Sequence, residues 1–147
     1  MKRYLLTTTF SLVTYLNITC DNHHINCADV RRGRFLYHSS ITNTDYLIER
    51  NDTIQTEIDT HSKIITRCKI VWVNDCEYYL TITQNNNPNR DGIDSFFEST
   101  PIKTSIVQVT SSYYIFSSKV DSIGKSLTLT DTMKILKWGD PFHFPRL

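Results

Sequence analysis

The sequence predicts an all-β fold: an antiparallel meander of about eight strands, forming a small, lipocalin-like barrel or a sandwich. The composition is one reason, because Tyr and Phe occur 8 and 7 times and Ile, Val and Thr recur throughout. β-Branched and aromatic side chains favour strands. The pattern is the other reason, because short alternating segments follow one another without an amphipathic helix between them. A chain of 147 residues suits a single domain.

Three strands are expected in the first part of the chain, at residues 34–38, 45–50 and 53–59. In the third strand, Ile54 and Ile58 alternate with Gln55 and Glu57. Such alternation is typical of a strand with one buried and one wet face. The isoleucines are therefore expected inside and the polar side chains in solvent.

The clearest hairpin joins residues 63–73 to residues 76–83 through a turn at 74–75. A two-residue turn there places Cys68 opposite Thr81. Because side chains alternate along a strand, Cys68 and Cys76 are then expected on opposite faces.

The remainder of the chain is expected to hold an irregular segment, more strands and a tail. The segment 84–101 is rich in Asn, with one helical turn expected at 93–98. Strands are predicted at 102–109, 113–119, 126–130 and 133–138, and the proline-containing tail 139–147 is expected to be irregular.

The N-terminus is typical of an export signal. Lys2 and Arg3 precede an uncharged run from Tyr4 to Leu16, which fits a signal sequence and is too short to span a membrane. The alternative is an N-terminal strand. The predicted organisation is a signal or lipoprotein-type leader at 1–20, a polar linker at 21–32, the β-domain at 33–138 and the tail. An exported protein is expected, either in the cell envelope (lipid-anchored or periplasmic) or secreted.

Four cysteines raise two questions. Cys20 follows the uncharged run and is a candidate for lipidation, the one predicted link to a membrane, with an unmodified Cys in the leader as the alternative. A disulfide between Cys27 and Cys76 is the favoured pairing, and Cys68 is expected to be a small buried residue. The cysteine spacings match no zinc site.

The charge of the chain indicates no nucleic-acid partner. The formal net charge is +1, and loss of residues 1–20 removes two basic residues, leaving 14 basic against 15 acidic, or −1. A nucleic-acid-binding domain usually carries a basic patch. No phosphate-binding loop motif is present either.

Three ordered motifs resemble a family of short bacterial envelope proteins with lipoprotein-like leaders, and the resemblance covers roughly residues 27–130. They are Cys27–Phe35, Ile48–Asp52 with Gln55–Glu57, and Val71–Tyr78. Members often carry a transferred "DNA topoisomerase IV" name, and the resemblance implies no established activity and no functional residues. The neutral charge and missing nucleotide motif leave the topoisomerase name unsupported.

Aromatic residues form the candidate ligand site. Trp72, Tyr78 and Tyr113 lie on expected strands, where a barrel interior lined by aromatics can hold a small apolar ligand. The alternative is that they fill the core. No catalytic residues and no cofactor are predicted, because no histidine is paired with a nucleophile and an orienting group. No metal site is predicted either, because His23 and His24 are adjacent and point apart in an extended segment.

Two functions follow from these observations. The first is a non-enzymatic exported β-domain that binds a protein or a small apolar ligand. The alternative is a hydrolase-type enzyme that uses exposed carboxylates, such as Glu57 and Glu77, together with His.

Overall fold

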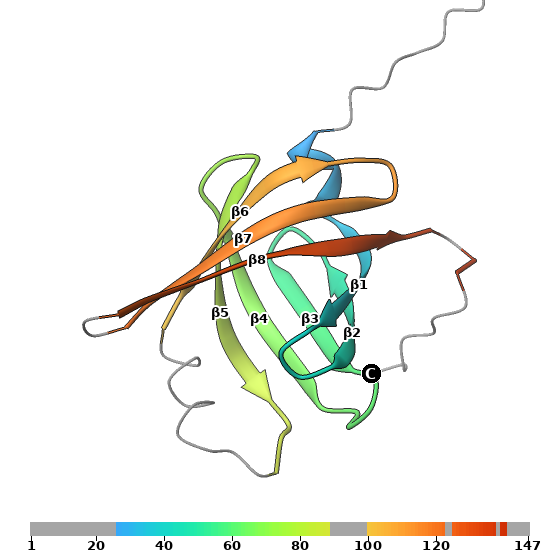
Figure 1. Ribbon diagram of the computed structural model, residues 1–147, viewed down its shortest axis with the longest axis vertical. Helices are drawn as coiled ribbons and strands as arrows, with labels where there is room; N and C mark the ends of the chain where they lie inside the picture. Colours follow the sequence, from blue (N-terminus) through green and yellow to red (C-terminus); the bar gives the residue numbers. More distant parts are fainter. Residues whose placement is uncertain (1–25, 89–99, 123–124, 138, 141–147) are drawn as a thin grey trace, which may run out of the picture.

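The computed structural model describes residues 26–88, 100–122, 125–137 and 139–140, and these form an eight-stranded β-barrel (Figure 1). The strands follow one another around the barrel in chain order, and β1 pairs with β8 to close it. All neighbouring strands are antiparallel, as a meander with short connections requires. The strands are β1 Gly33–Ser39, β2 Thr44–Arg50, β3 Ile54–Asp59, β4 Ile65–Trp72, β5 Glu77–Asn85, β6 Ile102–Val109, β7 Tyr113–Ser122 and β8 Lys125–Leu136.

The prediction of an all-β meander is confirmed, and the architecture is a barrel and not a sandwich. Two expected strands, 126–130 and 133–138, are one continuous strand, β8, which pairs with β7 from Lys125 to Lys134. The expected strand at residue 63 begins later, at Ile65, because Lys63 has a φ of 62° and cannot continue the strand.

The register of the β4–β5 hairpin differs from the predicted one. Cys68 pairs with Ile82 and Trp72 with Tyr78, so the connection is Val73–Cys76, closed by a hydrogen bond from the Val73 amide to the Glu77 carbonyl. Cys68 is buried and Cys76 packs against the same core. The expectation that these cysteines face opposite ways is therefore wrong. They do not bond to each other because Cys68 lies opposite Ile82, and Ile82 is about six residues, roughly 20 Å, along the strand from Cys76.

One end of the barrel is closed by the 3₁₀ helix η1, Cys27–Val30, which lies at the top of Figure 1. Asn26 caps this helix by accepting a hydrogen bond from the Ala28 amide. Val30 is 1% exposed and belongs to the core. These residues were expected to be part of a polar linker, and the buried Val30 instead makes them part of the barrel.

A disulfide and an aromatic contact hold η1 in place. Cys27 and Cys76 are joined, with their Cα atoms 5.0 Å apart, in the pairing that the sequence favoured. The Arg31 guanidinium lies 4.6 Å from the centre of the Trp72 ring and donates to the Asn74 carbonyl. The closed end is thus tied to the β4–β5 connection.

The opposite end of the barrel is less completely paired. β5 pairs with β6 only between Glu77 and Leu80, and β1 pairs with β8 only between Arg34 and Tyr37. Beyond these ladders the strands diverge, and the β7–β8 hairpin extends past the other strands at the left of Figure 1. This end is therefore the open end of the barrel.

Several expectations concern residues outside the described part of the chain. They are the leader 1–20 with Cys20, His23 and His24, the helical turn at 93–98 and most of the tail. In the described residues, no helix has the length and apolar character needed to cross a bilayer.

Candidate functional site

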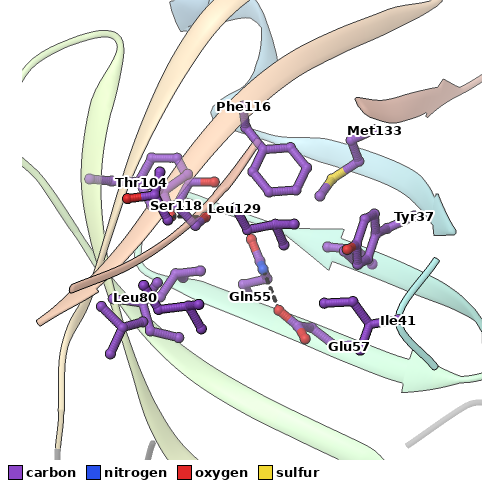
Figure 2. A pocket seen from close by; sticks show the side chains of 16 residues that line it. Tyr37, Ile41, Gln55, Glu57, Leu80, Thr104, Phe116, Ser118, Leu129 and Met133 are labelled. Atoms are coloured by element: carbon purple, nitrogen blue, oxygen red, sulfur yellow. Dashed lines mark hydrogen bonds between the residues drawn. The ribbon is translucent and has the colours of Figure 1, made fainter. Parts of the chain in front are cut away.

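A cavity of about 350 Å³ occupies the barrel between its core and its open end (Figure 2). This volume falls in the range of small-molecule sites, about 300–1,000 Å³. Most of the wall is apolar, and it comes from all strands except β4. The apolar lining residues are Tyr37, Ile41, Ile48, Tyr78, Leu80, Ile102, Phe116, Val120, Leu127, Leu129 and Met133.

The rim of the cavity is apolar and accessible. Ile41, in the connection between β1 and β2, is 80% exposed, and Leu127, on β8, is 66% exposed. Both line the cavity. Exposed aliphatic side chains beside an apolar hollow are typical of a ligand-binding mouth.

The polar side of the cavity comes from β3, whose faces are the reverse of those expected. Ile48 pairs with Glu57 and Arg50 pairs with Gln55 across the β2–β3 ladder. Direct partners share a face, so Gln55 and Glu57 point inward with Ile48, while Ile54 is 46% exposed on the outside. The expectation of a wet Gln–Glu face is therefore wrong.

Ile58, the other isoleucine of that strand, lies on the outer face and is nevertheless buried. It belongs to a second, smaller cluster with Leu47 and Leu136, against which Leu36 and Ile65 pack. Ile58 pairs directly with Leu47 and Ile65 across its neighbouring strands. This aliphatic row explains why isoleucine occupies an outward position.

Glu57 faces the cavity from β3. The Gln55 side-chain amide donates a 2.6 Å hydrogen bond to Glu57 Oε1, drawn as the dashed line in Figure 2. Burial raises the pKa of Glu57, and this effect outweighs the opposing effects of the Gln55 hydrogen bond and the Arg50 charge. The carboxyl group is thus an acid held in a largely apolar chamber.

Arg50 lies closer to the closed end of the barrel than Glu57 does, and it is buried in the core with 3% of its surface exposed. Its Nε donates to Gln55 Oε1 at 2.6 Å and its Nη1 donates to the Val30 carbonyl at 3.1 Å. Its Nη2 donates to the hydroxyl oxygens of Tyr78 and Tyr114, at 3.1 and 2.9 Å. The guanidinium thus directs four of its five N–H groups to neutral acceptors, and Arg50 does not line the cavity.

Two further polar pairs lie in or beside the cavity. The Thr104 and Ser118 hydroxyls are 2.9 Å apart and hydrogen-bonded. The Tyr37 hydroxyl donates to Asp131 Oδ2 at 3.3 Å. Burial, followed by the Asp131 charge, raises the pKa of Tyr37, so this phenol is a neutral donor at neutral pH.

The three aromatic residues proposed from the sequence fall in different places. Tyr78 lines the cavity and accepts from Arg50. Trp72 lies at the closed end, with its ring centre 4.6 Å from that of Tyr78. Tyr113 is 37% exposed, because its neighbour Tyr114 takes the inward position on β7. The expectation that all three face a ligand does not hold for Trp72 and Tyr113.

The carboxylates and histidines of the enzyme hypothesis lie in separate places. Glu77 is bound by Lys103 at 3.1 Å on the outer face, and this contact lowers its pKa. His38 contacts Asp45 at 2.7 Å, also on the outer face, and His61 is in the β3–β4 connection. Glu57 faces the interior. Among the described residues, no three His, Cys, Asp or Glu side chains are grouped to hold a metal ion.

The sequence analysis named Glu57 only as an exposed carboxylate, and it missed the inward positions of Arg50 and Gln55. The sequence did indicate an inward position for Arg50, because alternation along the strand places it on the same face as Tyr46 and Ile48. No family model, curated protein or solved structure matches the chain.

Proposed function

We propose that this protein is a non-enzymatic, exported binding protein that takes a small, largely apolar ligand into the open end of its barrel. The observation that carries the proposal is the cavity of about 350 Å³ with an apolar wall and an accessible rim. A chamber of this kind stabilises a ligand by removing its apolar surface from water. Its few polar groups, Gln55, Glu57 and the Thr104–Ser118 pair, then select among ligands.

The lining favours a small molecule over a protein as the partner. All but one of the described lining residues belong to barrel strands, and the chamber extends inward to Tyr78, which accepts a hydrogen bond from the buried Arg50. A protein surface cannot enter a chamber of this volume, whereas a short amphiphile can.

Two features support export. The Cys27–Cys76 disulfide is typical of proteins that fold in oxidising compartments. The basic start of the chain and the uncharged run that follows it, within residues 1–16, fit the pattern of a signal sequence. Fractionation of cells that express the native gene tests this part: the product should lie in the envelope or medium without Met1, and a cytoplasmic product that retains Met1 would contradict it.

Ligand binding is tested by titration with N-phenyl-1-naphthylamine, an uncharged apolar dye whose fluorescence rises in apolar surroundings. Ser118 and Ser117 are neighbours on β7, and only Ser118 lines the cavity. Ser118→Trp fills the chamber and should abolish the fluorescence rise, while Ser117→Trp adds the same side chain outside and should retain it. Circular dichroism checks that both variants fold.

A folded wild-type protein that gives no fluorescence rise would overturn the proposal. Equal loss of dye binding in folded Ser118→Trp and Ser117→Trp proteins would also count against the barrel interior as the site.

A further inference from the structure

Among the described residues that line the cavity, Glu57 is the only one with a charged side chain. Its carboxylate offers two oxygen atoms and about four lone pairs. The one hydrogen bond that the described residues make to it comes from Gln55 and reaches Oε1. Oε2 therefore receives no donor from the described part of the chain, although the group lies inside the barrel.

The nearest buried cation does not neutralise this carboxylate by contact. Arg50 directs its N–H groups to Gln55, Val30, Tyr78 and Tyr114. Gln55 lies between the two charges, accepting from Arg50 and donating to Glu57. The amide is hydrogen-bonded to both charged groups, but it leaves Glu57 without an ion-pair partner among the described residues.

Other carboxylates add to the acidic character of this region. Asp131 accepts the hydrogen bond of Tyr37, a lining residue. Asp59 and Glu57 line one adjoining hollow, with Tyr46 and Asn85. An anionic head group would meet these charges and no Arg or Lys side chain of the described lining, because Arg50 lies outside that lining and directs its N–H groups to core acceptors.

Resting on the proposed function, we infer that the ligand carries a cationic amine, which binds the Glu57 carboxylate, and an apolar body that lies along the facing wall. Removing a carboxylate from water is costly unless a donor compensates it, and an ammonium group supplies both charge and hydrogen bonds. The ligand class is therefore an alkylamine or arylalkylamine, and fatty acids of the same length are disfavoured.

The apolar body has a defined place. β3 and β7 lie four strands apart in the eight-stranded barrel, so Glu57 and Phe116 face each other across the chamber (Figure 2). Phe116, Leu129 and Leu80 form the apolar wall, and Leu127 continues it to the rim. An amine at Glu57 thus leaves its chain directed to the open end.

The experiment compares three ligands of one chain length, decylamine, decanol and decanoate, as competitors of N-phenyl-1-naphthylamine at neutral pH. Decylamine should displace the dye at a concentration at least about tenfold lower than decanoate, the scale of one charge-assisted hydrogen bond in a buried site. Decanol should lie between them.

The variants assign this preference to a residue. Glu57→Gln should remove the advantage of decylamine over decanoate. Glu49→Gln makes the same change of net charge on the outer face of β2, where Glu49 is exposed, and should keep the advantage. Equal displacement by decylamine and decanoate, or an unchanged preference in Glu57→Gln, would overturn the inference while decanol binding upholds the proposed function. Failure of the dye itself to bind would overturn both.

Discussion

Arg50 and Glu57 lie on the inner faces of neighbouring strands, carry opposite charges and form no ion pair with each other, because the Gln55 side chain stands between them. This arrangement divides the interior into two regions. Arg50 organises the core at the closed end with Tyr78 and Tyr114, and Glu57 supplies the charge of the cavity. The first role concerns stability, and the second concerns the ligand binding that we propose.

Replacing Arg50 by methionine should lower the free energy of unfolding by about 3 kcal/mol or more, since several buried polar groups lose their donor at once. Gln55 Oε1 and the Val30 carbonyl are the acceptors most affected. Urea denaturation followed by circular dichroism measures the change. Lys69→Met is the matched control, because Lys69 is exposed on the outer face of β4, and it should change stability by only about 0.5 kcal/mol. Equal stabilities of the two variants would contradict the structural role of Arg50.

Glu57 should make the free energy of unfolding fall as pH rises. Its pKa is raised in the folded protein, so its stabilising contribution is complete below the ordinary Glu pKa and is lost as pH rises through the folded value. Wild type should therefore lose stability relative to Glu57→Gln as pH increases from about 4.3, the ordinary Glu pKa. Urea midpoints measured at successive pH values test this.

The groups around Glu57 are common to wild type and variant, so the difference between the two proteins isolates its titration. They are Arg50 on β2, Asp59 on β3 and Cys68 on β4, with Tyr46 beside the adjoining hollow. Glu49→Gln controls for the loss of one acid from the surface. A stability difference between wild type and Glu57→Gln that stays constant from pH 4 to 9 would count against a raised pKa.

The Cys27–Cys76 bond should contribute about 3–4 kcal/mol, given that it closes a loop with a sequence separation of 49 residues. The double variant Cys27→Ser/Cys76→Ser should lose this amount and should not respond to reductant. Cys68→Ala retains the bond and should lose stability on reduction as wild type does. Mass mapping without reductant should find the peptides of Cys27 and Cys76 linked, and free thiols at both positions would refute the bond.

Cys68 should be unreactive in the folded protein. Burial, and secondarily the Glu57 charge, raises the pKa of its thiol, so the reactive thiolate is scarce. In a Cys20→Ser protein, native incubation with iodoacetamide should leave Cys68 unmodified, and unfolding in urea should allow one adduct by mass spectrometry. Rapid alkylation under native conditions would show that the thiol is accessible.

Strand positions and the meander order could be predicted because each strand carries its own period-two pattern and each turn its own polar residues. The face of β3 could not be predicted from that strand alone. Ile54 and Ile58 resemble core residues, yet both point outward, and Ile58 is buried in the outer aliphatic row with Leu47. Long-range pairing, and not local hydrophobicity, determines the face.

A consistency test within the sequence would have corrected this error. Ile48 and Tyr46 are inward residues, and a two-residue turn at Asn51–Asp52 already pairs Ile48 with Gln55. The observed connection is longer and pairs Gln55 with Arg50 instead of Ile48, which leaves the same set of side chains facing inward. The size of the cavity could not be predicted, because it depends on how far β5 and β6 separate between Leu80 and the open end of the barrel.

The position of the disulfide has a consequence for a chain that meets a protease. The bond encloses the connections between β1 and β2 and between β3 and β4, both at the open end, within one covalent loop. A single cut in either connection leaves two fragments joined through Cys27 and Cys76. The connections after β5 and β7 lie outside the loop, so a cut there releases the following strands once the barrel opens. A cut inside the loop therefore leaves the chain in one covalent piece, whereas a cut outside it does not.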